Sequence, residues 1–136
     1  MNDCIFCKVI AGELPSWKVY EDDHTIAFLD ITPVSKGHAL VVPKAHCADF
    51  VSADNACLQS VFKTTQKVAR AVLSATNADG CNVTINNGAV AGQSVFHFHV
   101  HIIPRFDGDG LTAWPQAPYA EGEADQMAGK IKSSFI

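Results

Sequence analysis

Residues 95–103 alternate histidines with aromatic and aliphatic side chains, and this pattern constrains the fold more than any other segment. Successive side chains of a β-strand point to opposite faces. A strand here therefore predicts an imidazole face formed by His97, His99 and His101. The opposite, apolar face consists of Phe96, Phe98, Val100 and Ile102. The apolar face can pack beneath a helix, so the imidazole face must line a cleft or a metal site.

The imidazole face allows three interpretations. The histidines could simply face solvent, but three in strict register are half of the six in the chain and disfavour this interpretation. Several of them could bind one metal ion, since histidines two apart on a strand can share a tetrahedral ion. Alternatively, one histidine is a nucleophile or general base, and its neighbours orient it and stabilise charge.

A loop of small residues leads into this strand and favours the last interpretation. It comprises Asn86, Asn87 and Gly88, followed by residues 91–95. Glycines let a backbone approach an anion closely, and the side chains of Gln93 and Ser94 offer hydrogen-bond donors. An anion cradle beside a row of imidazoles indicates phosphate chemistry rather than a bare metal centre.

The rest of the chain predicts an α+β domain with a mostly antiparallel sheet. We expect five strands, at residues 17–21, 25–31, 38–42, 81–85 and 95–103. One long helix is expected at residues 53–78 because its apolar residues recur at helical spacing, with Ser52 as the N-cap and Gly80 near its end. Shorter helices are expected at residues 4–14 and 120–134. Pro104 is expected to begin an irregular tail.

Composition excludes several classes of protein. The formal net charge of −4 argues against binding of long nucleic acid, which depends on clustered lysine and arginine. No apolar stretch is long enough to span a membrane, and the first ten residues do not form a signal peptide. Five cysteines, only two of them closely spaced, do not form a secreted disulfide framework. We therefore expect a reduced, cytoplasmic protein with no membrane partner.

Three sequence blocks resemble the histidine triad (HIT) nucleotide-binding superfamily. Residues 92–103, GQSVFHFHVHII, resemble its His-φ-His-φ-His-φ-φ motif, and residues 37–44, GHALVVPK, and 27–31, AFLDI, resemble two further blocks. The resemblance implies the HIT-like fold, a five-stranded mostly antiparallel sheet with one long helix and short terminal helices. It also implies a homodimer of single HIT domains spanning residues 1–136, with a core at 4–105 and a variable tail at 106–136.

The resemblance implies a nucleotide hydrolase or transferase that cleaves at the α-phosphate. His99 corresponds to the family's nucleophile, which forms a covalent nucleotidyl-histidine that water then hydrolyses. His101 and Ser94 correspond to positions that contact the phosphate and the departing group. His38 corresponds to a histidine near the triad.

The resemblance also implies a pocket for a purine nucleotide, such as AMP in a conjugate. Asp30 matches the acid that binds the ribose hydroxyls. The phosphate-binding positions are matched by Asn86, Gln93 and the backbone N–H of Val95. The apolar pocket around the base is matched by Ile5, Phe6, Val9, Phe28 and Ile31. A pocket with so few polar groups would accept either purine.

The pair Cys4 and Cys7 resembles the start of the zinc-containing bacterial branch of the family. There two cysteines, the histidine of a Pro-Lys-x-His block and the first triad histidine bind the metal, and His46 and His97 match the last two. Two thiolates and two imidazoles suit a tetrahedral structural zinc. Idle thiols and a redox pair are the alternatives.

The substrate stays open at this point. Phosphoramidates, dinucleoside polyphosphates and aminoacyl adenylates all join an α-phosphate to a leaving group, and Ser94 favours the phosphoramidate. The alternatives are a dinucleoside polyphosphate hydrolase, a non-catalytic nucleotide-binding regulatory protein and a metal-dependent enzyme that uses all three triad histidines. The chain beyond Arg105 follows no pattern that distinguishes them.

Overall fold

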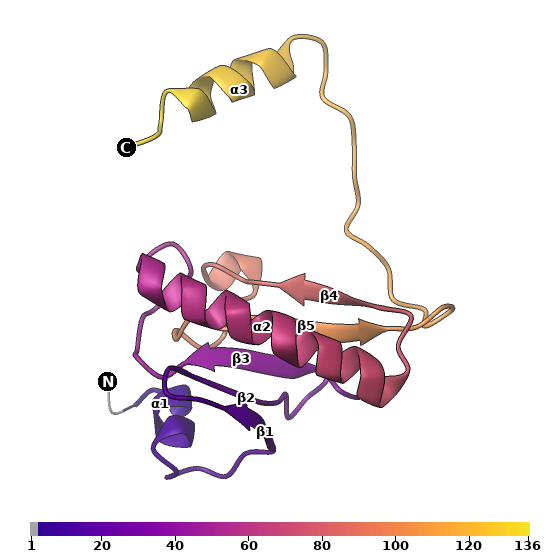
Figure 1. The fold of residues 1–136 in the computed structure, drawn as a ribbon. Coiled ribbons are helices and arrows are strands. Elements are labelled where there is room, and N and C mark those ends of the chain that lie inside the picture. The colour runs from indigo at the N-terminus through magenta and orange to yellow at the C-terminus, as the bar shows by residue number, and fades with distance from the viewer. Residues whose placement is uncertain (1–2) are drawn as a thin grey trace.

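One sheet of five antiparallel strands forms the body of the computed structural model, which describes residues 3–136 (Figure 1). The strand order is β1-β2-β3-β5-β4. The strands are β1 (Lys18–Glu21), β2 (Thr25–Leu29), β3 (Ala39–Pro43), β4 (Gly80–Thr84) and β5 (Val100–Arg105). The helices are α1 (Ile5–Ile10), α2 (Asn55–Thr76), the short 3-10 helix η1 (Ala89–Ala91) and α3 (Glu123–Lys132). The α+β class, the antiparallel sheet, the long helix and the short terminal helices are confirmed. Met1 and Asn2 of the predicted domain lie outside the described residues.

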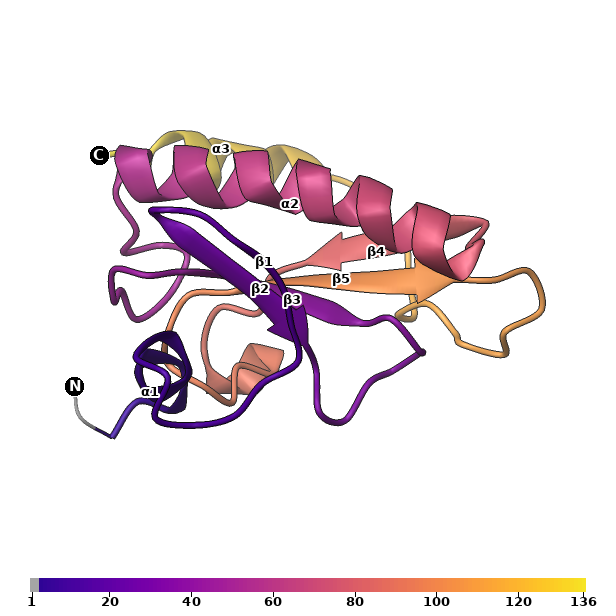
Figure 2. The same ribbon diagram turned by 60° about the horizontal axis from the view of Figure 1, so that its bottom comes forward.

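The helices α2 and α1 lie on opposite faces of the sheet (Figure 2), and each face buries its own core. On one face, α2 packs against Ala39 and Val41 of β3 and against Val100 and Ile102 of β5. On the other face, α1 contributes Phe6 to a cluster whose other buried members are Ile26, Phe28, Leu40 and Val42. All five residues of β3 are buried. A central strand that is covered on both faces needs a continuous apolar run, which residues 39–43 provide.

The ends of α2 differ from the prediction. The N-cap is Asp54, whose carboxylate accepts a hydrogen bond from the backbone N–H of Cys57 at 2.8 Å. Ser52 is not the cap because its hydroxyl group bonds to the carbonyl of Asp49 in the preceding turn. The helix ends at Asn77, which adopts a left-handed conformation, so Gly80 begins β4 instead of ending the helix.

The fifth strand is shifted toward the C-terminus relative to the prediction. It starts at Val100 and continues through Pro104, which was expected to begin the tail. A proline is tolerated here because β3 does not extend this far, and the Ser35 hydroxyl donates to the Pro104 carbonyl at 2.6 Å instead. Phe98 packs in the α2 core, whereas Phe96 is 51% exposed and does not join it.

The C-terminal segment stands away from the sheet (Figure 1). Every residue from 111 to 136 is exposed, and the segment ends in α3. Its large exposed apolar side chains include Trp114, Tyr119, Met127, Ile131 and Phe135. No helix within residues 3–136 combines the length and apolar character that a membrane crossing requires.

Candidate active site and metal centre

The triad histidines lie on the sheet face that α1 covers. His97 is fully buried and His99 is 7% exposed, and the ring of Phe6 contacts both, with centroids 6.0 and 5.0 Å away. The His99 and His101 rings lie 5.0 Å apart. Within this shared face the histidines divide into two groups. His97 faces Cys4 and Cys7, whereas His101 contacts His38.

Hydrogen bonding fixes the tautomer of His99. Its Nδ1 lies 2.7 Å from the backbone carbonyl oxygen of His97. A carbonyl only accepts, so Nδ1 carries the proton and Nε2 keeps its lone pair. Burial lowers the pKa of His99, opposed by the His97 carbonyl and the charge of Asp30. His99 is thus a neutral imidazole with a lone pair at Nε2, which is the form a nucleophile requires.

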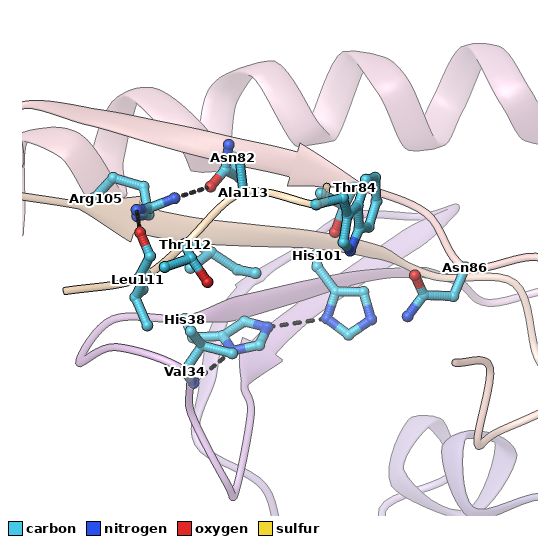
Figure 3. A pocket seen from close by; sticks show the side chains of 12 residues that line it. Val34, His38, Asn82, Thr84, Asn86, His101, Arg105, Leu111, Thr112 and Ala113 are labelled. Carbon is cyan, nitrogen blue, oxygen red and sulfur yellow. Dashed lines mark hydrogen bonds between the residues drawn. The ribbon is translucent and has the colours of Figure 1, made fainter. Parts of the chain in front are cut away.

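A second chain of hydrogen bonds orients His101 (Figure 3). The backbone N–H of Val34 donates to His38 Nδ1 at 3.1 Å, so the other nitrogen of His38 carries its proton. His38 Nε2 donates to His101 Nδ1 at 2.9 Å, which leaves His101 Nε2 as an N–H donor. Burial lowers the pKa of His101 to about 4, with further lowering by His99 and His38. His101 is therefore a neutral donor beside the lone pair of His99.

Among residues 3–136, two clusters bring candidate metal ligands within 4.8 Å of one another. One contains Asp30, His38 and His101. It is a poor metal site, because the proton on His38 Nε2 is used in the bond to His101 and that nitrogen offers no lone pair. This hydrogen-bond chain favours a metal-free role for His101.

The other cluster contains Cys4, Cys7, His46 and His97, and its geometry fits zinc. His97 Nε2 donates to the Pro43 carbonyl at 2.8 Å, so its Nδ1 lone pair faces the cluster. That atom lies 3.1 Å from His46 Nδ1, and the three short sulfur–nitrogen distances are 3.4, 3.4 and 3.6 Å. Around a tetrahedral zinc, with Zn–N of about 2.0 Å and Zn–S of about 2.3 Å, nitrogen–nitrogen and sulfur–nitrogen pairs of ligand atoms lie roughly 3.3–3.6 Å apart. The four donor atoms thus surround a space of the size that this ion needs.

The loop before the triad is held by the side chain of Gln93, which is only 4% exposed. Its Oε1 accepts from the backbone N–H of Gly88 at 2.9 Å. Its Nε2 donates to the carbonyls of Ala48 and Val95 at 2.8 and 3.2 Å. Both ends of the amide are therefore engaged with backbone. Ser94, by contrast, is exposed at the end of this loop.

The residues predicted for the sugar and base lie around α1 and the end of β2. Asp30 accepts at Oδ1 from the backbone N–H of Thr32 at 2.8 Å, and its Oδ2 lies 3.6 Å from His38 Nε2. Phe6 and Phe28 are buried, with ring centroids 5.4 Å apart. The remaining predicted residues are less buried: Val9 is intermediate, and Ile5 and Ile31 are exposed. The apolar set therefore divides into a buried aromatic pair and an exposed rim.

A cavity of about 600 Å³ adjoins His101 on the same sheet face, over β4 and β5 (Figure 3). Arg105 shapes it by donating to Asn82 at 2.7 Å and to the carbonyl of Leu111 at 3.2 Å. The lining residues that were not predicted are Val34, Asn82, Thr84, Ile103, Arg105, Leu111, Thr112, Ala113 and Trp114. One signal could have revealed part of this wall, since polar residues alternate at positions 82, 84 and 86. The segment 111–114 carries no comparable pattern.

Comparison with known proteins identifies the family. A model of the HIT domain matches residues 11–108. The chain belongs to the HIT family. The protein hit of Bacillus subtilis is 51% identical over 113 residues, which cover 82% of this chain and 78% of that protein. The predicted resemblance to a bacterial-type HIT protein is therefore confirmed.

Two further HIT relatives bear on function. The adenylylsulfatase HINT3 of Arabidopsis thaliana is 43% identical over 132 residues, covering 97% of this chain and 67% of that protein. A zinc-bound histidine triad family protein from Mycobacterium smegmatis is 33% identical with a TM-score of 0.78, covering 98% of this chain and 99% of that one. The HIT protein described here thus belongs to a superfamily of nucleotide-binding proteins and hydrolases, and its Cys/His cluster is consistent with zinc.

Proposed function

We propose that this HIT protein hydrolyses purine nucleoside phosphoramidates through a covalent nucleotidyl-histidine on His99. The observation that carries the proposal is the tautomer of His99. Its Nδ1 proton is held by the His97 carbonyl at 2.7 Å, so the Nε2 lone pair is free to attack phosphorus. A non-catalytic binding protein has no need of this arrangement, which supports an enzyme.

In the proposed first step, His99 Nε2 forms a bond to the α-phosphorus and the bond to the leaving nitrogen breaks. The amine departs with a proton supplied by solvent, which the second step returns, and the nucleotide stays on His99. Water then attacks the phosphorus, releases AMP and restores the neutral imidazole. The N–H of His101, oriented by His38, would stabilise the phosphoryl oxygens, and Ser94 and Asn86 would contact the phosphate and the departing group. Asp30, whose carboxylate lies between Thr32 and His38, would bind the ribose hydroxyls.

The zinc ligands proposed are Cys4, Cys7, His46 and His97. Zinc bound there would supply structural cross-links among α1, the loop after β3 and the triad segment, leaving the chemistry to metal-free His99. We also propose that the chain is one HIT domain over residues 1–136, with its core at 4–105 and its tail at 106–136. The free state of all five cysteines within the described chain favours a cytoplasmic location.

A homodimer is supported by two surfaces of the chain. The strand β4 lies at an edge of the sheet, where its outer backbone groups have no strand partner. The C-terminal segment exposes Tyr119 and Ile131 instead of packing them on its own sheet. A second copy that pairs along β4 would cover such surfaces. Sedimentation equilibrium should give twice the chain mass, and a monomer at micromolar concentration would contradict this arrangement.

A second candidate substrate is adenylyl sulfate, because the Arabidopsis relative is an adenylylsulfatase. It presents the same α-phosphorus to His99 with sulfate as the leaving group. Dinucleoside polyphosphates form a third class, with a nucleotide as the leaving group. Turnover of all three classes should be compared side by side, and we expect adenosine and guanosine phosphoramidates to react fastest.

The covalent route is tested with variants of two histidines. His99→Ala should abolish turnover, yet AMP affinity should stay within several-fold of wild type because the phosphate-loop donors remain. His101→Ala should reduce the rate only in part, because the attacking atom is still present. Rapid quench followed by mass spectrometry at neutral or alkaline pH should show a nucleotidyl adduct on His99. An adduct elsewhere, or near-normal turnover by His99→Ala, would refute the mechanism.

A further inference from the structure

We propose that Gln93 is a positioning residue that couples the proposed metal centre to the loop that would hold the phosphate. The phosphate loop is defined here as residues 86–95, and the ligand segment as residues 46–48, which begins with His46. The proposal rests on the proposed nucleotide and zinc sites and gives the metal a second role. Occupancy by zinc would set the shape of the phosphate loop as well as the stability of the fold.

The ligand segment makes hydrogen bonds directly to the candidate active site. The carbonyl of Cys47, the residue after His46, accepts a hydrogen bond from the backbone N–H of Phe98 at 2.8 Å. Phe98 lies between the first two triad histidines. The carbonyl of the next residue, Ala48, accepts from Gln93 Nε2 at 2.8 Å. The two residues that follow a proposed metal ligand thus bond to the triad segment and to the phosphate loop.

Gln93 joins three parts of the backbone at once. Besides its bond to Ala48, its Nε2 donates to Val95 and its Oε1 accepts from Gly88. The backbone N–H of Gln93 also donates to the Gly88 carbonyl at 3.1 Å, which closes the loop on itself. A shift of Ala48 must therefore either break the bond to Gln93 or move the phosphate loop with it.

The hydrogen bonds also argue against a direct phosphate contact by the Gln93 side chain. An amide has two N–H donors, and both of them already point at carbonyls. The side chain is 4% exposed, so a phosphate could reach it only after the loop opened. The geometry therefore points to an indirect role, in which Gln93 holds the backbone that contacts the phosphate.

A second connection runs through His97. Its ring nitrogen Nδ1 faces the sulfur atoms of Cys4 and Cys7, while its backbone carbonyl holds the proton of His99. The same residue therefore serves the proposed metal centre with its side chain and the proposed nucleophile with its main chain. Loss of the metal would release the His97 ring. Within residues 3–136, Gln93 is the phosphate-loop side chain that bonds to the ligand segment itself. Asn87 bonds farther along the chain, where its Oδ1 accepts from the backbone N–H of Val51 at 3.0 Å.

Hydrogen exchange of zinc-loaded and chelator-treated protein tests the coupling without a nucleotide. In the wild type, removing zinc should speed exchange in residues 86–95 by at least several-fold and leave β1 and β2 unchanged. In Gln93→Met, which keeps the side-chain volume but not the hydrogen bonds, the loop should exchange fast with or without zinc. Gln93→Glu keeps the acceptor for Gly88 and loses the donor to Ala48. It should uncouple the loop even if the Met variant folds poorly.

A matched control is Thr65→Val on α2. Thr65 is also 4% exposed, and its hydroxyl donates to the Val61 carbonyl on the other side of the sheet. The substitution removes that single hydrogen bond. This variant should respond to zinc removal as the wild type does, which separates coupling from a general loss of stability. A wild-type loop that is indifferent to zinc would overturn the proposal. So would a zinc response of normal size in both Gln93 variants, or wild-type protein that retains no zinc.

Calorimetry with AMP provides the second measurement. Zinc should tighten AMP binding to the wild type about fivefold or more, which is the lower end of common coupling between sites. In Gln93→Glu, zinc should leave the AMP affinity unchanged. Coupling of equal size in both proteins would overturn the proposal. Complete absence of AMP binding would instead overturn the proposed function, and hydrogen exchange would still decide the role of Gln93.

Discussion

Gly37→Ala should destabilise the protein strongly, because two separate costs meet at this position. Gly37 has φ +101°, and an added Cβ would lie 2.7 Å from Thr76 Cγ2 on α2. The left-handed backbone costs an alanine about 1–2 kcal/mol, and forcing a methyl group into a packed contact costs about 1–3 kcal/mol more. The free energy of unfolding should thus fall by about 2–5 kcal/mol. At roughly 4 °C per kcal/mol for a chain of this size, the Tm should drop by about 8–20 °C.

Two comparisons separate the costs of the Gly37 substitution. Gly12→Ala meets the backbone cost alone, since Gly12 has φ +77° and nothing lies within 4 Å of its added Cβ. Thr76→Ser deletes the clashing methyl group and keeps the hydroxyl that donates to the Val72 carbonyl. The double variant should therefore recover about 1–3 kcal/mol relative to Gly37→Ala, measured against Thr76→Ser in urea titrations. Equal losses for the two glycine variants, or no recovery in the double variant, would refute the steric argument.

Three further outcomes are expected. Elemental analysis of wild type should give about one zinc per chain, and Cys4→Ser should lose this zinc and show a lower Tm. Wild type that is purified without chelators and holds no zinc would contradict the metal centre. Asp30→Ala should weaken ribonucleotide binding more than deoxyribonucleotide binding, and calorimetry showing equal losses would exclude a ribose contact. Burial lowers the pKa of His101 from 6.5 to about 4 and also lowers that of His99, so the unfolded chain binds more protons in this range. Stability should thus be full above pH 6.5 and decline as the pH falls toward 4, and a urea midpoint unchanged between pH 7 and pH 5 would contradict this.

The fold could be predicted because its determinants are local and repeat along the chain. Alternation at positions 97–102 assigned the triad side chains to one face and Phe98, Val100 and Ile102 to the α2 core, and the structure places them so. The N-cap of α2 could not be decided in this way. Ser52 and Asp54 are both good capping residues, and the turn at Asp49, which occupies the hydroxyl of Ser52, depends on tertiary geometry.

Contacts between distant backbone segments could not be predicted from the sequence for a similar reason. Before β5 begins at Val100, the backbone N–H of Phe98 donates to the carbonyl of Cys47 in the loop after β3, and no side-chain pattern encodes this contact. The role of Gln93 is likewise set by its backbone partners, because the residue type alone suits a phosphate contact equally well. The cavity beside His101 depends on how Arg105 holds residues 109–111, which lie outside any motif.

The placement of separate cores on the two faces of the sheet also has an evolutionary consequence. Substitutions at Val61, Val68 and Val72 of α2 meet only a packing constraint, so related volumes can replace one another while the opposite face is undisturbed. Phe6 must satisfy packing against Phe28 and also contact the His97 and His99 rings. The α2 face should therefore tolerate substitution more freely than the α1 face, where each change must also preserve the contacts with the imidazoles.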